Sequence, residues 1–311
     1  MSTEPLFSRT RQGSVGSLGE GALIARIRRW LGEASPVSPK GIGDDCAVLA
    51  PARGRELLTV DPVIAGIHFD RRVSAGQVGG KLFKRNLSDI AAMGGRPRAA
   101  VVALALDSRV SLRWLAEFYR GLARESLRYR VPVVGGDVAR LPGSFVATLA
   151  LAGEAPGRVM TRKGARPGDW IYVTGLLGRS LQSGHHHRFA PRLAEGAWLA
   201  RQAGVRAMMD LSDGLAKDLA ELTPKGCEAA LFAKMLPCRA GASTREALSD
   251  GEDYELVLAF RGGREKDSLE RAWKRAFPRI PLTCVGRFVR RGDLPAGLLN
   301  LKEYRGYEHL R

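Results

Sequence analysis

The stretch AGQVGGKLFKRNLSDIAAMGGRPRAAVVALAL (residues 75–106) predicts a helix that leads directly into a buried strand. Phe83, Leu87 and Ile90 recur at helical spacing and form one apolar stripe, while Asp89 lies on another face. The run after the double glycine is apolar and is typical of a strand in the interior of a sheet. A helix joined to a strand in this way indicates a fold in which helices cover a β-sheet.

Helices and strands alternate outward from this stretch in both directions. The further helices predicted from apolar spacing lie at residues 19–32, 111–129, 192–204 and 264–277. The further strands predicted from β-branched and apolar runs lie at 46–50, 56–69, 131–137, 145–154, 170–175 and 253–260, and 207–222 is a strand that becomes a helix. Because the regular βαβ rhythm of a doubly wound sheet is missing, we expect an α/β or α+β class in two lobes.

A loop-rich segment at 155–169 marks the expected domain boundary. We expect a disordered leader at 1–18, an N-terminal domain at 19–154 and a C-terminal domain at 155–311, since 311 residues suffice for two domains. No apolar run reaches the roughly 20 residues of a membrane-spanning helix, and the N-terminus lacks the apolar core of a secretory signal. We therefore expect a cytoplasmic protein without a membrane partner.

The chain is strongly basic, with 49 Lys and Arg against 32 Asp and Glu and a formal net charge of +17. Such a surplus favours nucleic acid or small anionic substrates as partners. Because the arginines are scattered and not interleaved with aromatic residues, we do not expect a nucleic-acid partner. The four cysteines follow neither zinc-site nor disulfide spacing, which predicts reduced thiols.

Aspartates recur at predicted strand ends and helix starts, beside Gly, Ser or Asn. Taken singly, each is explained by a turn or a helix cap. If several converge, two carboxylates about 4 Å apart repel each other by about 4 kcal/mol at an effective dielectric near 20, so cations have to be present. Oxygen ligands without His or Cys select Mg²⁺, which is held together with water and substrate phosphates. The aspartates are Asp45, with Asp44 beside it, Asp61, Asp89, Asp137, Asp210 and Asp213.

Two further features indicate a nucleotide ligand. Gly135 and Gly136 precede Asp137 and would let the backbone approach a phosphate closely, and Arg162 is a candidate for phosphate oxygens. The sequence contains no P-loop, no dinucleotide-binding glycine motif and no catalytic loop of a protein kinase. We therefore expect a nucleotide site on a different fold.

At these residues the sequence resembles the thiamine-monophosphate kinase family of the aminoimidazole-ribonucleotide-synthetase-like superfamily. The most specific stretches are GIGDD (41–45), NLSDIAAMGG (86–95), DLSDGL (210–215) and GEDYEL (251–256). Four others occur in the family's order: VDPVIAGIHF (60–69), VVGGD (133–137), TRKGARPGDWIYVTG (161–175) and GYEH (306–309). The resemblance thus spans almost the whole chain.

The resemblance implies an N-terminal lobe that pairs across a homodimer, a C-terminal α/β lobe, and ATP-dependent phosphorylation of thiamine monophosphate to thiamine diphosphate with several Mg²⁺ ions. The implied metal ligands are Asp45, Thr59, Asp61, Asp89, Asp137, Asp210 and Asp213. The implied ATP contacts are Gly136, Asp137, Arg162 and Ser212. The implied contacts to thiamine monophosphate are His68, Glu252, which reaches a polar ring group, and Tyr307, which stacks on a ring. Asp44 is expected to shape its turn or to bind metal through water.

This chemistry requires no general base. A phosphate monoester has a second pKa of about 6, so the acceptor oxygen is already anionic at neutral pH. Positioning and charge neutralisation then suffice for an in-line, metal-assisted transfer.

Several positions depart from the family pattern. Val60 stands where Thr is usual, and the segment 175–192 is short and has Arg179 in place of an acid. Its tract His185-His186-His187 is open to two interpretations, a metal-binding tract or a solvated loop, of which we favour the loop.

Two other functions are consistent with these departures. One is a related ATP-dependent enzyme acting on another small phosphorylated substrate, against which the retained His68, Glu252 and Tyr307 argue. The other is a non-catalytic, basic nucleic-acid-binding or regulatory homologue. Retention of the aspartates argues against it, because an inactive site has no physical need for clustered carboxylates.

Overall fold

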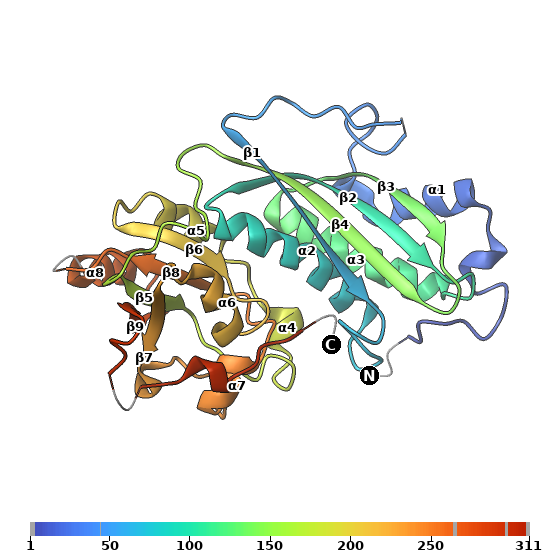
Figure 1. Ribbon diagram of the computed structural model, residues 1–311. Helices are drawn as coiled ribbons and strands as arrows, with labels where there is room; N and C mark the ends of the chain where they lie inside the picture. The colour runs from blue at the N-terminus through green and yellow to red at the C-terminus, as the bar shows by residue number, and fades with distance from the viewer. Residues whose placement is uncertain (1–3, 44, 264–265, 296–297, 309–311) are drawn as a thin grey trace. The chain divides into compact units, whose positions relative to one another are not determined.

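The chain forms two compact units. The computed structural model describes the following stretches (Figure 1): residues 4–43, 45–263, 266–295 and 298–308. The first unit contains the residues up to Leu87 and Pro97–Glu154, and the second contains Ser88–Arg96 and the residues from Ala155 onward. The sequence assigns 88–96 to the N-terminal domain, whereas this segment belongs to the second unit.

The first unit is built on a four-stranded sheet. Its strands, in pairing order, are β1 (Arg55–Ile64), β4 (Phe145–Ala155), β2 (Arg96–Leu106) and β3 (Val133–Arg140). Strands β2 and β3 pair in parallel because helix α3 (Leu112–Tyr129) carries the chain back between them. Helices α1 (Glu20–Leu31), α2 (Ala75–Ala92) and α3 lie on one side of the sheet (Figure 1).

Aromatic side chains and close helix contacts form the core of the first unit. Trp114 stacks on Phe118 with ring centroids 5.7 Å apart and meets Phe145 edge-on at 4.8 Å. Helices α2 and α3 touch through glycine, since a Cβ atom added to Gly121 would lie 2.0 Å from the carbonyl oxygen of Gly76. Only residues without a side chain permit this approach.

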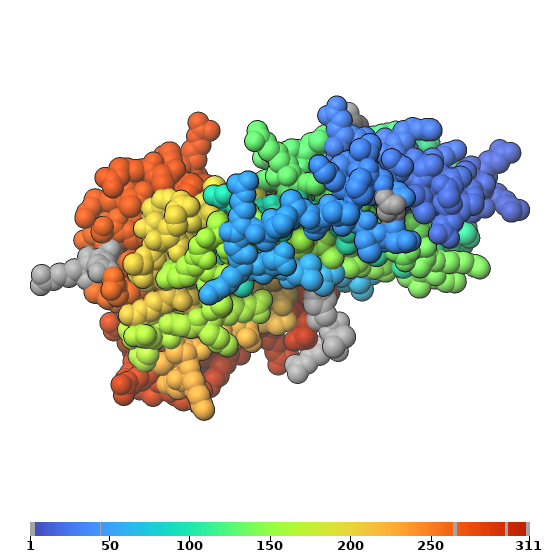
Figure 2. All heavy atoms as spheres, turned by 90° about the horizontal axis from the view of Figure 1, so that it is seen from above, coloured from blue at the N-terminus to red at the C-terminus, as the bar shows by residue number. Residues whose placement is uncertain are grey.

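The opposite face of this sheet carries exposed apolar side chains. Leu58 and Val60 on β1 are 80 % and 59 % exposed, and Val101 on β2 is 40 % exposed. The loop before β1 also lies at the surface, with Val48 62 % exposed (Figure 2). An exposed apolar surface of this kind on one face of a sheet is typical of an interaction site.

The second unit is built on a five-stranded antiparallel sheet. Its strands, in pairing order, are β6 (Val205–Asp210), β8 (Leu256–Phe260), β5 (Trp170–Thr174), β9 (Leu282–Arg290) and β7 (Cys227–Leu231). Its helices are α4 (His185–Arg188), α5 (Leu193–Ala200), α6 (Leu215–Leu222), α7 (Thr244–Ser249) and α8 (Lys266–Ala276).

Both faces of this second sheet are covered. One cluster of buried residues joins Val257 of β8 to Leu219 of α6 and Leu248 of α7. A second cluster joins the neighbouring β8 residue Leu258 to Leu199 of α5 and Trp273 of α8. Successive residues of a strand point to opposite faces, which explains why β8 is buried along its whole length.

The predicted elements around residue 100 are confirmed. Helix α3 begins where the sequence predicts it, and the Ser111 side chain accepts a hydrogen bond from the Trp114 N–H at 3.3 Å. The strand predicted at 46–50 is wrong: this segment is irregular, since it lies in the exposed loop before β1. Strands β7 and β9 were not predicted from the sequence. For β7 the reason is that CEAAL (227–231) lacks the β-branched residues that favour a strand.

Residues 4–18, which the sequence places in a disordered leader, make backbone contacts with the rest of the first unit. Phe7 bridges Val110 and Ser14 bridges Ser111 in antiparallel pairing, and the Ser8 N–H donates to the Arg109 carbonyl oxygen at 2.8 Å. These backbone hydrogen bonds hold the segment against the start of α3, and a composition-based prediction does not detect such long-range pairing.

The cysteines and the hydropathy of the helices agree with the sequence. Cys46, Cys227, Cys238 and Cys284 are free thiols, as predicted. Within the stretches that the structure describes, no helix combines the length and the apolar character needed to cross a bilayer.

Candidate functional site

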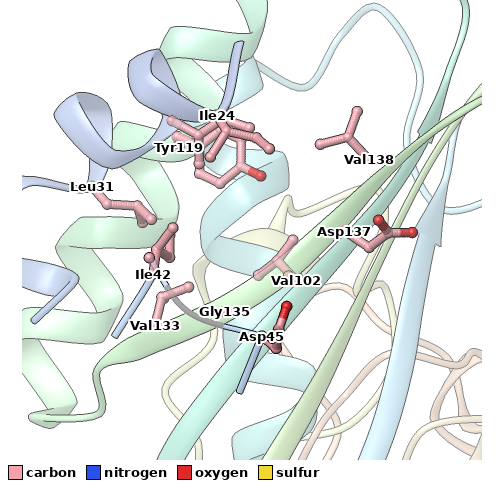
Figure 3. A pocket seen from close by; sticks show the side chains of 13 residues that line it. Ile24, Leu31, Ile42, Asp45, Val102, Tyr119, Val133, Gly135, Asp137 and Val138 are labelled. Atoms are coloured by element: carbon pink, nitrogen blue, oxygen red, sulfur yellow. The ribbon is translucent and has the colours of Figure 1, made fainter. Parts of the chain in front are cut away.

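A pocket of about 480 Å³ in the first unit contains two of the predicted aspartates. Figure 3 shows apolar side chains of α1, among them Ile24 and Leu31, on one side and the carboxylates of Asp45 and Asp137 away from them. Asp137 lies on β3 and Asp45 in the loop before β1, and both are exposed. Asp44, the neighbour of Asp45, lies outside the described residues. The pocket thus offers an apolar surface and two carboxylates to one ligand.

The glycines before Asp137 are required by the packing of β2 and β3. Gly136 pairs with Val102, and a Cβ atom added to Gly136 would lie 2.1 Å from the carbonyl oxygen of Val102. An added Cβ at Gly135 would lie 3.3 Å from the Val101 side chain. Both glycines line the pocket, so its wall here is bare backbone. Such a wall can approach a phosphate closely, as the sequence predicts.

Asp61 and Thr59 lie on β1 and point to the same face of the strand, being two residues apart. Asp61 Oδ1 is 3.4 Å from Nη2 of Arg85, whose Nη1 donates to the Pro62 carbonyl oxygen at 2.6 Å. The Arg85 side chain is buried. A cation at Asp61 would therefore share this carboxylate with a fixed guanidinium.

His68, the predicted substrate contact, lies in the interior of the first unit. Its Nδ1 accepts the Ile64 N–H at 3.1 Å, and its carbonyl oxygen accepts the Lys81 ammonium at 2.7 Å. Acceptance at Nδ1 places the proton of the neutral ring on Nε2. The imidazole and Lys81 together fix the turn that ends β1.

Three loops of the second unit meet, and they carry the family motifs DLSDGL, GEDYEL and GYEH. The Glu252 N–H donates to the Ser212 carbonyl oxygen at 2.7 Å, and the Tyr307 N–H donates to the Asp213 carbonyl oxygen at 2.9 Å. Close approach requires glycine at two points, because a Cβ atom on Gly251 or Gly306 would lie within 2.7 Å of a backbone oxygen. The structure thus brings together Ser212, Asp213, Glu252 and Tyr307, which are far apart in sequence.

Asp210 and Asp89 belong to the same unit. Asp210 ends β6, is 5 % exposed, and its Oδ2 accepts the Ser88 hydroxyl at 2.8 Å. Asp89 follows Ser88 on α2 and is half-buried. The NLSD and DLSD motifs are therefore joined by a direct hydrogen bond. Arg162, the predicted ATP contact, lies in an exposed loop.

Glu252 is followed by two buried carboxylates, Asp253 and Glu255, that have a different role. Asp253 accepts from the Gly178 N–H and from Arg239 at 3.0 Å, and Glu255 accepts from Arg192 Nε at 2.6 Å. Burial raises the pKa of both carboxyls, and these hydrogen bonds act against that rise. Their partners fix the loop, whereas the Glu252 side chain remains 19 % exposed. Glu252 is thus the acid of this motif that a ligand can reach.

Sequence reasoning missed two residues that shape the DLSDGL loop. Asp218 Oδ2 accepts the N–H groups of Ser212 and Asp213 at 3.0 Å each, and its burial raises its pKa to about 7. Lys217 Nζ lies 2.8 Å from Asp213 Oδ2 and donates to the Tyr307 carbonyl oxygen at 2.6 Å. Both residues lie in the stretch GLAKDL (214–219) that continues the motif. The signal available in the sequence was Asp218 itself, because an aspartate close to a turn often accepts hydrogen bonds from the backbone N–H groups of that turn.

The tract His185–His187, predicted as a solvated loop, is helix α4, and His186 is buried. The prediction is wrong because the tract packs on the Glu252 segment: His185 Nε2 is 2.9 Å from the Asp253 carbonyl oxygen. Arg179, in place of the family's acid, donates from Nη1 to the Gly241 carbonyl oxygen at 2.8 Å. The Arg179 guanidinium therefore stabilises a contact between two loops.

The predicted metal ligands are all oxygen donors, which suit a hard divalent cation. Within the described part of the chain, no three His, Cys, Asp or Glu side chains are grouped so as to hold one ion. Four of the seven predicted ligands occur in pairs, with Asp45 and Asp137 around one pocket and Asp210 and Asp213 at one loop. Mg²⁺ is normally held by one or two carboxylates together with water and substrate phosphates. These oxygen-only pairs therefore fit Mg²⁺ and do not fit a closed structural metal site.

Comparison with known proteins gives consistent matches. Residues 43–159 match the family model described as AIR synthase related protein, N-terminal domain. Thiamine-monophosphate kinase of Escherichia coli strain K12 is 34 % identical over 331 aligned positions, covering 94 % of this chain and 98 % of that protein. The crystal structure of thiamine-monophosphate kinase from Stenotrophomonas maltophilia K279a superimposes with a TM-score of 0.71 at 30 % identity, covering 88 % of this chain and 95 % of that one.

A further structure, described as AaThiL complexed with AMPPCP and TMP, superimposes with a TM-score of 0.68 at 27 % identity. The superposition covers 98 % of this chain and 100 % of that one. These matches confirm the predicted mixed α/β fold class and the resemblance seen in the motifs.

Proposed function

The chain belongs to the thiamine-monophosphate kinase family, and from this we propose that it transfers the terminal phosphoryl group of ATP to thiamine monophosphate, giving thiamine diphosphate. The observation that carries the proposal is the meeting of the three motif loops in the second unit, with Glu252 partly exposed beside Ser212 and Asp213. The relative AaThiL was crystallised with AMPPCP and TMP. Both reactant classes of the proposal are thus represented in a close structural neighbour.

Different groups of residues would bind Mg²⁺, ATP and thiamine monophosphate. Carboxylates at Asp45, Asp137, Asp210 and Asp213 would hold Mg²⁺, with Thr59, Asp61 and Asp89 as further candidates. Bound Mg²⁺ would neutralise the phosphate oxygens of two anionic reactants and stabilise the in-line transition state. Bare backbone at Gly136, together with Arg162 and Ser212, would position ATP. Glu252, Tyr307 and His68 would orient thiamine monophosphate, and its phosphate needs no general base because it is already anionic near pH 7.

The test is product formation by purified protein with ATP, Mg²⁺ and thiamine monophosphate, followed by mass spectrometry. We expect thiamine diphosphate and ADP in equal amounts, and no product with excess chelator. If ATP binds by calorimetry and no product forms, the acceptor is a different phosphorylated molecule. Absence of ATP binding as well would favour the non-catalytic homologue.

We also propose a homodimer formed through the exposed sheet face of the first unit. The Leu58→Glu variant is expected to sediment as a monomer, because Leu58 is 80 % exposed on that face and a charge there opposes its burial. Leu127→Glu is the matched control, since Leu127 is 49 % exposed at the end of α3 and not on the sheet. A wild-type monomer at micromolar concentration in analytical ultracentrifugation would contradict the proposal.

A cytoplasmic location is consistent with this function. ATP and reduced thiols occur together in the cytoplasm, and the four cysteines are free.

A further inference from the structure

The histidine helix α4 is tied to both the side chain and the main chain of the segment that carries Glu252. His186 Nδ1 lies 3.5 Å from Glu252 Oε2, and the two side chains are only 8 % and 19 % exposed. His185 Nε2 lies 2.9 Å from the carbonyl oxygen of the next residue, Asp253. This short helix, which the sequence predicts as a solvated loop, therefore packs on Glu252, the carboxylate proposed to contact the substrate.

The backbone at Glu252 is held in an unfavourable conformation. Glu252 and Tyr254 have φ angles of +64° and +50°, a region that residues with a side chain rarely adopt. The Glu252 N–H is fixed by the Ser212 carbonyl oxygen, and the Tyr254 N–H by that of Leu211 at 2.8 Å. Strain of this kind persists where surrounding contacts hold a functional residue in place.

The second oxygen of the carboxylate is also supported from the region of α4. The Tyr254 hydroxyl lies 3.4 Å from Glu252 Oε1. The Tyr254 ring stacks on Phe189 with centroids 4.1 Å apart and planes inclined by 20°. Phe189 directly follows α4. One oxygen of Glu252 is therefore oriented by His186 of α4, and the other by Tyr254, whose ring packs on the residue that follows α4.

A second histidine orients the first. His187 Nδ1 lies 3.0 Å from His186 Nε2, and the two rings stand at 82° to each other. A neutral imidazole has one donor and one acceptor nitrogen. If His186 presents its Nδ1–H to the carboxylate, its Nε2 accepts, and the donor is the Nδ1–H of His187. In this arrangement His187 would select the tautomer of His186 that faces Glu252.

We propose that His186, with its tautomer set by His187, is a positioning residue that aims the Glu252 carboxylate at the ring system of thiamine monophosphate. The proposal rests on the proposed function, in which Glu252 contacts that substrate. His186 acts through the side chain of Glu252, and its own side chain contacts Glu252 and His187. Its loss is therefore expected to weaken binding of thiamine monophosphate without changing the phosphoryl-transfer step or the binding of ATP.

The first test separates these parameters with matched variants. His186→Leu is expected to raise KM for thiamine monophosphate about 10-fold, equivalent to about 1.4 kcal/mol, with kcat and KM for ATP within about twofold of wild type. His186→Asn, whose amide N–H replaces the Nδ1–H, is expected to recover most of the loss. Leu181→Ala, at an exposed residue of the same segment, is the control and should match wild type. Unchanged KM in His186→Leu, or equal impairment of His186→Asn with a lower melting temperature, would overturn the proposal.

The second test needs no catalytic activity. Nitrogen-15 NMR of the histidines in the full-length protein is expected to show both His186 and His187 protonated at Nδ1, with the His186 signal shifted in Glu252→Gln. Protonation of His186 at Nε2 would overturn the proposal. This readout remains valid if no thiamine diphosphate forms, so failure of the function and failure of the histidine pair can be told apart.

Discussion

The Asp210→Asn variant is expected to lose at least about 100-fold in kcat/KM for phosphoryl transfer, because it removes one negative charge from a buried site that we propose holds the Mg²⁺ that neutralises the phosphates. Asp210 is 5 % exposed at the end of β6, where solvent does little to stabilise its charge. Asparagine keeps the shape and an acceptor for the Ser88 hydroxyl, which lies 2.8 Å from Oδ2. The loss is therefore one of charge and not of fold.

Steady-state kinetics at increasing Mg²⁺ concentration measure this effect. The variant is expected to require more Mg²⁺ for its residual activity, with a melting temperature close to that of wild type. Asp169→Asn is the matched control, since Asp169 is a buried aspartate of the same unit that lies 3.3 Å from Arg206, away from the motif loops. Its Mg²⁺ dependence should equal that of wild type even if its stability falls. Retention of half the wild-type activity in Asp210→Asn would remove this residue from the metal site.

Replacing Gly136 by alanine is expected to destabilise the protein by about 3 kcal/mol or more and to abolish ATP binding. The added methyl group would lie 2.1 Å from the Val102 carbonyl oxygen, so β2 and β3 have to move apart. The same methyl group would enter the wall of the pocket beside Asp137. Backbone collision, unlike contact with a flexible side chain, cannot be relieved by a rotamer change.

Chemical denaturation and calorimetry with ATP check this prediction. Gly21→Ala is the control, because nothing lies within 4 Å of a Cβ atom there and Gly21 is in helix α1. Its stability should rise by about 0.5–1 kcal/mol, since alanine favours a helix more than glycine does. Wild-type stability and ATP affinity in Gly136→Ala would mean that the β2–β3 pair tolerates widening at this point.

The elements with strong local signals were predictable from the sequence. Helix α3 has an apolar stripe and a serine cap, and β4 alternates buried and half-buried residues over its length. Strand β7 could not be recognised, because its place in the sheet depends on pairing with β9, more than 50 residues later in the chain. The apolar run at 46–50 shows the converse case. Its residue types favour a strand, but Val48 lies in an exposed, irregular loop and not in a sheet.

Candidate site residues were predictable as motif members, but their surroundings were not. The family resemblance implied a role for Glu252, and its place at a predicted strand end singled out Asp210. Neither observation indicated that His186 packs on Glu252 or that Ser88 bonds to Asp210. These contacts join segments 66 and 122 positions apart, so no local rule contains them. For Asp61 the sequence predicted a metal ligand but not its neighbour. The structure places the guanidinium of Arg85 beside this carboxylate.

The division of α2 between the two units has a consequence for dissecting the protein into fragments. A recombinant piece spanning 155–311 would contain every strand of the second sheet but would lack Ser88–Arg96. It would lose the hydroxyl that bonds Asp210, and Gly196 would lose the Ala91 backbone against which it is packed. Separate expression of the catalytic halves therefore requires a circularly rearranged or co-expressed design that restores the end of α2 to its own sheet.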